Sequence, residues 1–304
     1  MMSELALEVR ELRKTYKTVG GTQEALRGLD LSVRKGQVYG YVGPNGAGKS
    51  TSIKILLGLV RPDSGTALVM GHPAGSVEAR RLLGYLPEVA VYHEFMGAEE
   101  LLVLHAALAG VPASERLARC RTALEMVGLG SRMKSRIREF SKGMKQRFGI
   151  AQALVADPPL LVLDELTSGL DPIAQLELKE LIMSLKERGI TIFFSSHMMS
   201  EVETVCDSIG IIHQGRLRAE GTLQDLLSIE NQVAIHFRGP TDELAELKPQ
   251  PAKAGEQVIT VEQAGSDAAL DRIRQAGGSI LTVAPAKRHL EDVLHQLVTA
   301  GETA

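Results

Sequence analysis

The sequence is poor in features that mark several classes of protein. Tryptophan is absent, aromatic residues make up 4% of the chain, and cysteine occurs only at Cys120 and Cys206, without metal-ligand spacing. This usage favours buried thiols in a reducing compartment. The first residues are charged and hold no apolar signal segment, and no apolar run approaches the ~20 residues of a membrane-spanning helix. We expect a cytoplasmic protein that contacts a membrane only through a partner.

Excess positive charge is missing as well. The 34 basic residues face 37 acidic ones, for a net charge of -3. No whole-protein field therefore favours nucleic acid or anionic lipid, and no heptad run indicates a coiled coil. What is present is ordinary globular composition, with 44% hydrophobic residues in 304. That is enough for one large domain and a small one.

Apolar patterning predicts the fold class of the first part of the chain. Two early segments alternate apolar and polar residues, around 5–9 and 29–33, which predicts antiparallel strands. Three later runs, at 38–42, 160–163 and 190–194, are continuously apolar, as in a parallel sheet that is covered on both faces. The stretch from 97 to 157 is predicted to be mostly helical. One helix face would contain Leu117, Cys120, Leu124 and Val127.

The composition shifts beyond about residue 225. A proline-containing stretch is followed by alternation at Val233, Ile235 and Phe237, which predicts a strand, and by a helical pattern that ends in IRQAGG. ILTV predicts a further strand. A last helix would present one apolar face, made of Leu290, Val293, Leu294, Leu297 and Val298. We predict a domain boundary here, with residues 1–225 in the first domain and 226–304 in a small C-terminal α/β module.

A glycine-rich loop is the strongest local motif. Residues 43–51 read GPNGAGKST, which matches G-x-x-x-x-G-K-[ST] between an apolar run and an amphipathic helix pattern. Glycines let backbone N–H groups approach phosphate oxygens, the helix adds its positive end, and Lys49 adds a charge. The predicted nucleotide-binding residues are Gly43, Pro44, Asn45, Gly46, Ala47, Gly48, Lys49, Ser50 and Thr51. The alternative is a glycine-rich turn that feeds a core helix.

Acidic residues and a histidine follow two other apolar runs. Asp164 and Glu165 come directly after the run at 160–163, and His197 comes shortly after the run at 190–194. Adjacent carboxylates are costly unless a cation is near, so we predict that Asp164 binds Mg²⁺ and that Glu165 orients or deprotonates an attacking water. His197 would donate to a γ-phosphate oxygen. The alternatives are a solvated acidic turn and a structural loop histidine.

The stretch FSKGMKQR at 140–147 raises the question of a second anion site. Ser141 is a good helix cap, a glycine follows at Gly143, and positive charge is close by. Most of the charges in this region are equally typical of a solvated helix face. They are Arg132, Lys134, Arg136, Arg138, Lys142, Lys145 and Arg147.

Taken together, GPNGAGKST, FSKGMKQR, LVLDELTSGLDP and SSH, in this order, resemble the ATP-binding cassette family, the nucleotide-binding subunits of ABC transporters. The resemblance covers about residues 4–225, and FSKGM occupies the place of the family's signature motif, usually LSGGQ. It implies an α/β P-loop cassette with a parallel core sheet, an antiparallel β subdomain and a helical subdomain at about 90–157. It also implies that two cassettes pair head to tail. Ser141, Gly143 and Met144 of one copy would then contact ATP held by the other.

Further roles are implied by the same resemblance. Tyr16 would stack on adenine, the alternative being ordinary packing of a strand aromatic. Glu88, in GYLPE, stands where the family usually has glutamine and would face Mg²⁺ or water. The loop from Ser168 to Asp171 would face the partner cassette, with Asp171 among the nucleotide contacts. Besides Glu88, the chain departs from the usual motifs at Lys142, Met144 and Leu166, and YLPE and SKGM together resemble a subgroup that serves exporters.

The expected function is ATP hydrolysis with Mg²⁺. Catalysis is assigned to Lys49, Glu165 and His197, and the metal to Ser50, Asp164 and Glu88. The expected partners are a second copy of the chain and a separately encoded membrane permease, at the cytoplasmic face of the membrane, without nucleic acid. The apolar segment 89–96 would receive the permease unless it packs in the core. Two alternatives stay open, a soluble ATPase acting on ribosomes or DNA ends and a regulatory or scaffolding subunit.

Overall fold

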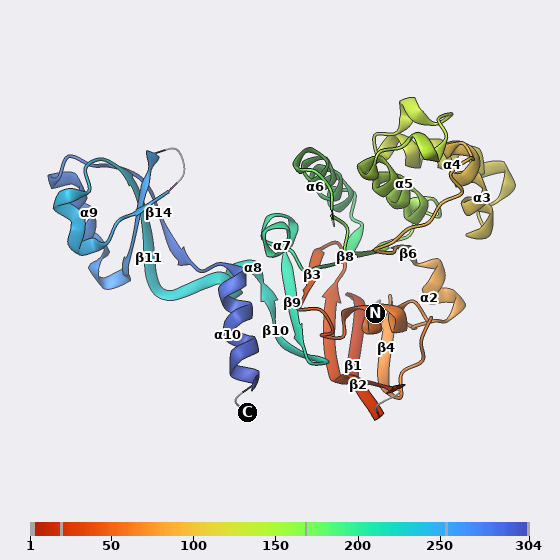
Figure 1. Ribbon diagram of the computed structural model, residues 1–304, viewed down its shortest axis with the longest axis horizontal. Helices are drawn as coiled ribbons and strands as arrows, with labels where there is room; N and C mark the ends of the chain where they lie inside the picture. Colours follow the sequence, from red (N-terminus) through yellow and green to blue (C-terminus); the bar gives the residue numbers. More distant parts are fainter. Residues whose placement is uncertain (1–3, 19–20, 168, 253–254, 303–304) are drawn as a thin grey trace. The chain divides into compact units, whose positions relative to one another are not determined.

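The structure is a computed structural model that describes residues 4–18, 21–167, 169–252 and 255–302 (Figure 1). The chain divides into two compact units, Met1–Leu223 and Gln224–Ala304. In the first unit an antiparallel sheet, a mostly parallel sheet and a group of helices pack together. The predicted α/β class is therefore confirmed.

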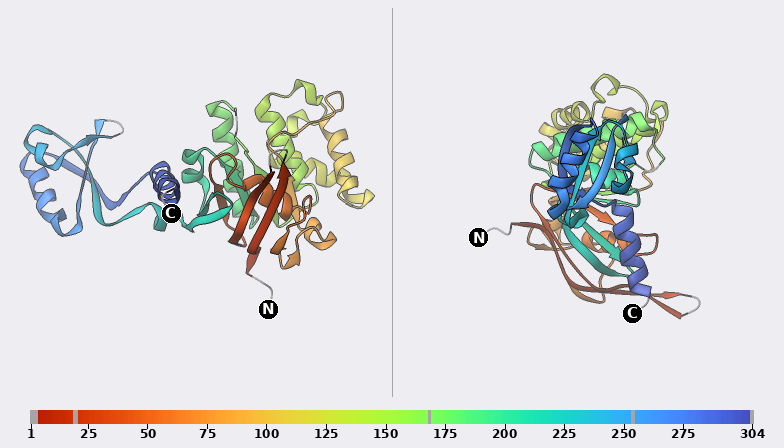
Figure 2. Two further views of the ribbon diagram at one scale, coloured as in Figure 1. Left: turned by 60° about the horizontal axis from the view of Figure 1, so that its bottom comes forward. Right: turned by 90° about the vertical axis from the view of Figure 1, so that its left-hand side faces the viewer.

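The antiparallel sheet has the strand order β2-β1-β4-β5. Its long strands β1 and β2 pair in the register Leu7 with Val33 and Val9 with Leu31, so the apolar residues of both strands share one buried face. This is the alternation that the sequence predicts. Figure 2 shows the two strands in red. The strands are β1 (Leu5–Thr18), β2 (Gly21–Arg34), β4 (Ser64–Val69) and β5 (His72–Pro73).

The central sheet has the order β10-β9-β3-β8-β7-β6, with parallel pairing except between β9 and β10. Every residue of β3, β7 and β8 is buried, as expected for the continuously apolar runs. The strands are β3 (Val38–Val42), β6 (Leu83–Leu86), β7 (Leu160–Asp164), β8 (Thr191–Ser196), β9 (Ser208–His213) and β10 (Arg216–Thr222).

Helices cover the central sheet and form the predicted helical region, where α3, α4 and α5 lie together (Figure 1). The helices are α1 (Lys49–Leu56), α2 (Val77–Arg81), α3 (Ala98–Leu108), α4 (Ala113–Met126), α5 (Lys142–Leu154), α6 (Pro172–Glu187) and α7 (Met199–Val205). The predicted apolar face of α4 is partly wrong. Cys120 and Leu124 are buried, but Leu117 is 45% exposed. The buried face of α4 includes Ala123 in its place.

The second unit is a small α/β module with its own core. Its sheet has the order β12-β13-β11-β14, and Ile235 and Phe237 of β11 pack with Ile259 and Ile273. Its elements are α8 (Leu223–Leu227), which begins one residue before the unit, β11 (Ser228–Arg238), β12 (Gln250–Pro251), β13 (Gln257–Glu262), α9 (Ser266–Gln275), β14 (Ser279–Lys287) and α10 (Leu290–Glu302). Within the described part of the chain, no helix combines the length and apolarity that crossing a bilayer requires.

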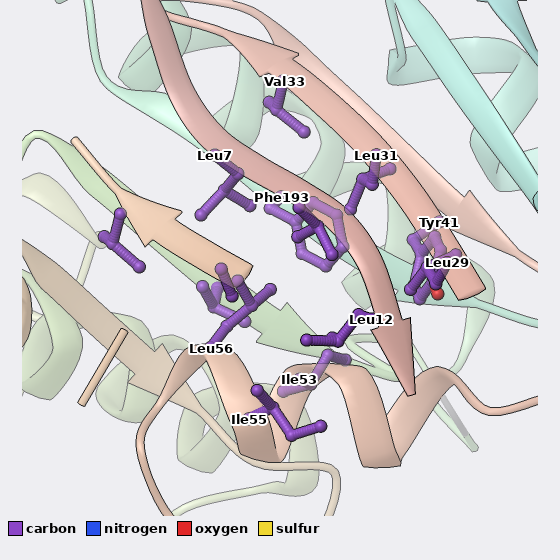
Figure 3. Close-up of a cluster of buried hydrophobic side chains, with 14 of the residues drawn as sticks. Leu7, Leu12, Leu29, Leu31, Val33, Tyr41, Ile53, Ile55, Leu56 and Phe193 are labelled. Carbon is purple, nitrogen blue, oxygen red and sulfur yellow. The ribbon is translucent and has the colours of Figure 1, made fainter. Parts of the chain in front are cut away.

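The core of the first unit lies between its two sheets. Phe193 of β8 stacks on Tyr39 at 5.8 Å between ring centroids and lies 5.2 Å from Tyr41. Leu31 of β2 and Ile53 of α1 belong to the same buried cluster, so both sheets and α1 share one core (Figure 3). Helix α1 is thereby held directly behind the loop that precedes it.

Replacing Phe193 by alanine should destabilise this unit by about 3–5 kcal/mol, because a buried ring is lost and a cavity remains. Urea unfolding followed by circular dichroism measures the change. The control is Leu59→Ala, at a side chain that is 67% exposed, where a change within about 0.5 kcal/mol is expected. Equal effects of the two substitutions would contradict this account of the core.

Candidate functional site

The carboxyl ends of adjacent parallel strands bring the predicted residues together. Val42 of β3 pairs with Ser196 of β8, and Ser195 pairs with Asp164 of β7. Leu86 of β6 lies beside Leu163 of β7. Each strand then leads into one part of the site: the glycine-rich loop, His197, Glu165 and Glu88. Ligands of parallel sheets bind at such carboxyl ends.

The glycine-rich loop adopts a conformation that only glycine tolerates at certain points. Gly46 and Gly48 have φ of 80° and 115°, in the left-handed region. A Cβ on Gly43 would collide with the backbone carbonyl of Ile212. The loop therefore places bare backbone directly before α1, whose N-terminal N–H groups are available to an anion.

Lys49 is the buried cation of the site. Its side chain is 8% exposed, and its ammonium donates to the carbonyl of Gly43 at 2.5 Å and to that of Pro44 at 3.4 Å. The Glu165 carboxylate lies 3.9 Å away. Burial lowers the pKa of Lys49, and the charges of Glu165, Asp164 and Glu88 oppose that shift. The lysine therefore lies among acidic groups whose charges partly offset the effect of its burial.

Asp164 is held at the end of β7 by its neighbour on β8. Its Oδ1 accepts a hydrogen bond of 2.5 Å from the Ser195 hydroxyl. Burial raises the pKa of Asp164, outweighing the Ser195 hydrogen bond and the attraction of Lys49, and the charge of Glu165 adds to the increase. A buried carboxylate beside a second carboxylate is costly without a cation. This is the electrostatic condition from which a metal ligand was predicted.

Glu165 has a left-handed backbone conformation, which is unusual for a residue other than glycine. Its φ is 50°, and its N–H donates to the Ser195 carbonyl at 3.0 Å. Its Oε2 lies 2.5 Å from Nδ1 of His197, whose side chain is 53% exposed. Strained residues of this kind persist only where the surroundings fix them, and they cluster at functional sites. The geometry therefore places carboxylate, imidazole and ammonium side by side.

A cavity of about 370 Å³ lies over these groups. Its lining contains the predicted residues Tyr16, Pro44 to Thr51, Glu88, Glu165 and His197. It also contains Gln23 and Ala25 of β2, which the sequence reasoning missed. Gln23 pairs with Tyr16 across the β1–β2 ribbon, so predicting the register of that ribbon could have found it.

The second predicted anion site does not join this cavity. Ser141 caps α5, because its hydroxyl accepts a hydrogen bond from the Met144 N–H at 3.2 Å. Gly143 is buried, and a Cβ added to it would lie 3.0 Å from the side chain of Ala174. Asp171 caps α6 in the same way, from the Ala174 N–H at 2.9 Å. None of these predicted residues lines the 370 Å³ cavity. Ser168, predicted in the same loop as Asp171, lies outside the described residues.

The three predicted Mg²⁺ ligands all have side-chain oxygen atoms. Ser50 and Glu88 are exposed on the cavity, and Asp164 lies close enough to Glu165 and Lys49 for their charges to affect its pKa. All three offer oxygen, the ligand that Mg²⁺ prefers. Among the described residues, no group of three or more His, Cys, Asp or Glu could hold a metal by itself. The oxygen donors of these three residues fit Mg²⁺.

Comparisons with known proteins found a matching family model and similar sequences. Residues 26–168 match the family model described as ABC transporter. The chain is 38% identical over 304 residues to an uncharacterised ABC transporter ATP-binding protein of Nostoc sp., covering 97% of this chain and 90% of that one. It is 42% identical over 235 residues to the bacitracin transport ATP-binding protein BcrA of Bacillus licheniformis, covering 76% of this chain and 74% of the relative.

A solved structure shares the architecture. A dimeric ATP-binding cassette in a post-hydrolysis state, bound to ADP and Pi, superimposes with a TM-score of 0.61 and 25% identity. The match covers 71% of this chain and 98% of that one. The cassette fold predicted from the order of the motifs is confirmed.

Replacing Asp164 by asparagine should raise the melting temperature at neutral pH in the absence of nucleotide and divalent cation. Because the folded-state pKa of Asp164 is raised, the carboxyl favours folding below its ordinary value of about 3.9, and this contribution is lost as pH rises through the raised pKa. The gain from Asp164→Asn should therefore shrink as pH falls toward 4. Differential scanning fluorimetry at several pH values measures it.

The matched control is Asp157→Asn at an exposed turn residue with a left-handed φ of 57°, which asparagine tolerates. Its effect should not change with pH in this way. A gain from Asp164→Asn that is the same at pH 4 and pH 7.5 would refute the electrostatic origin.

Proposed function

Because the chain belongs to the family of ABC transporter ATP-binding proteins, we propose that it hydrolyses ATP to drive a separately encoded membrane permease. The observation that carries the proposal is the meeting of Lys49, Glu165 and His197 beside one cavity at the carboxyl ends of β3, β7 and β8. In this proposal residues 1–225 are the ATP-binding cassette and residues 226–304 an accessory module. The cassette acts at the cytoplasmic face of the membrane, through its permease.

The binding site receives ATP and Mg²⁺ in defined places. The loop from Gly43 to Thr51 and the N-terminus of α1 surround the phosphates, and Lys49 exchanges its carbonyl partners for phosphate oxygens. Tyr16, which pairs with Gln23 and lines the same cavity, stacks on adenine. Ser50, Asp164 and Glu88 would hold Mg²⁺, which neutralises charge that develops on the phosphates.

Hydrolysis depends on the polar groups beside the phosphates. Glu165 orients an attacking water and accepts its proton, and the 2.5 Å contact with His197 fixes the direction of the carboxylate. His197 donates to a γ-phosphate oxygen, and Lys49 stabilises the negative charge that grows there. All these contributions are electrostatic or concern proton transfer. No covalent enzyme intermediate is needed.

A second copy of the chain completes the site in this proposal. Ser141, Gly143 and Met144 do not line the cavity of their own chain, although Ser141 and the N-terminus of α5 form a good phosphate contact. Head-to-tail pairing would bring them, with Asp171, to the ATP of the other copy. The similar solved cassette is dimeric, which supports the arrangement.

The permease would dock on an apolar patch, defined by Val89, Val91 and Phe95. These side chains are 74%, 89% and 77% exposed, and they follow Glu88 directly in the chain. Exposed apolar clusters of this kind favour a protein partner. The expectation that Tyr92 belongs to the same surface is wrong. Its ring packs edge-on against Phe148 at 5.2 Å and its hydroxyl is buried.

The direction of transport is proposed as export. The YLPE and SKGM motifs, which resemble those of an exporter subgroup, support this assignment. The cargo would be selected by the permease, since the cassette residues described here are committed to nucleotide and to partner contacts.

Replacing Glu165 by glutamine should lower kcat for ATP hydrolysis by about 100-fold or more, because the amide cannot accept the proton of water. ATP binding should persist, and a dimer should form on addition of ATP. Phosphate release and size-exclusion chromatography measure the two effects. Hydrolysis by Glu165→Gln at the wild-type rate would refute the catalytic assignment, and an ATP-bound protein that stays monomeric would refute the shared site.

Charging the docking patch, with Val91→Asp and Phe95→Asp, should release the chain from its permease while ATP hydrolysis by the free chain stays within about twofold, because exposed substitutions far from structural contacts rarely disturb a fold. Co-purification from detergent-solubilised membranes measures the association. Leu59→Asp, at an exposed apolar residue outside the patch, is the control and should keep the permease. Retention of the permease by the patch variant would reject this docking surface.

A further inference from the structure

Helix α5 is joined to the catalytic strand end by a side-chain hydrogen bond. The amide Nε2 of Gln146 donates to the backbone carbonyl of Leu166 at 2.8 Å. Leu166 follows Glu165 directly and is itself buried. The bond therefore connects the helix that begins at Ser141 with the residue next to the proposed catalytic carboxylate.

This hydrogen bond completes a pair of anchors around Glu165. The N–H of Glu165 itself donates to the Ser195 carbonyl at 3.0 Å. One residue later, the Leu166 carbonyl accepts a hydrogen bond from Gln146. The left-handed φ of 50° at Glu165 needs such external support, because a residue with a side chain loses free energy in this region. Gln146 thus helps to fix the backbone from which the carboxylate extends.

Other contacts join α5 to α6, the helix that follows the Glu165 segment. Arg147 forms an ion pair of 3.4 Å with Glu177 of α6. An added Cβ on Gly143 would already lie 3.0 Å from the side chain of Ala174. The N-terminal halves of α5 and α6 are therefore closely packed over several residues. A displacement at the start of α5 has a direct route to Leu166.

We propose that Gln146 is a positioning residue that couples the two nucleotide sites of the dimer. The inference rests on the proposed function, in which the N-terminus of α5 contacts ATP held by the second copy. Contact there would shift α5, and the hydrogen bond from Gln146 would carry the shift to Leu166 and set the Glu165 carboxylate of the same chain. Each copy would thereby sense, at its own catalytic residue, whether the other copy has bound ATP.

The test compares Gln146→Leu and Gln146→Glu in the full-length chain. Both lack the N–H donor, and the glutamate keeps the shape of the side chain. We expect kcat to fall about tenfold, the order of a lost hydrogen bond to a buried partner, and the Hill coefficient for ATP to fall toward 1. KM should change little. Gln146→Lys, which restores a donor, should recover much of kcat and of the cooperativity.

The control is Lys145→Gln, one residue earlier on α5, whose partner is Glu94 rather than the catalytic segment. It should keep kcat and the Hill coefficient. Melting temperatures of all variants, and ATP-dependent dimer formation in a Glu165→Gln background, separate this role from a loss of folding or binding. If the Glu165→Gln protein forms no ATP-dependent dimer, the proposed function fails. If it does, and the two donor-free variants remain cooperative at wild-type kcat, only the coupling role of Gln146 is overturned.

Discussion

The structure of the site depends on one buried ammonium group placed among carboxylates. Lys49 is desolvated, and Glu165, Asp164 and Glu88 offset that cost by their charge. Asp164 and Glu165 repel each other when both are ionised, and the positive charge of Lys49 offsets that repulsion. Parallel strands are the reason that they can meet, because adjacent strands of one sheet end at the same edge. The aromatic core of Phe193, Tyr39 and Tyr41 then holds those strands in register.

Much of this arrangement could be predicted from local patterns. The continuous apolar runs indicated buried parallel strands, and the polar residues immediately after them could only lie at one edge of the sheet. The glycine spacing at 43–48 predicted a loop whose backbone requires glycine, as Gly48 and its φ of 115° show. These features are local or follow from strand direction, so no knowledge of tertiary packing was needed.

Other residues were missed or misplaced because their surroundings come from distant parts of the chain. Gln23 reaches the cavity through its pairing with Tyr16, Ser195 supports Asp164 from the neighbouring strand, and Gln146 of α5 donates to the carbonyl of Leu166 in the turn after β7. Tyr92 lies in the apolar segment 89–96, yet its ring packs edge-on against Phe148 of α5 and its hydroxyl is buried. Helical periodicity alone also could not decide whether the buried face of α4 would include Leu117. Such outcomes are set by packing, which a pattern along one segment does not contain.

The internal bonds of Lys49 have a consequence for turnover. Its ammonium already has the carbonyls of Gly43 and Pro44 as acceptors. Under the proposed function, an incoming phosphate would replace these acceptors rather than fill an unsatisfied site, so the net gain would be smaller than the strength of the new contact. When the terminal phosphate left, the lysine would return to the loop without remaining unpaired. On this proposal the site would release spent nucleotide readily instead of retaining it.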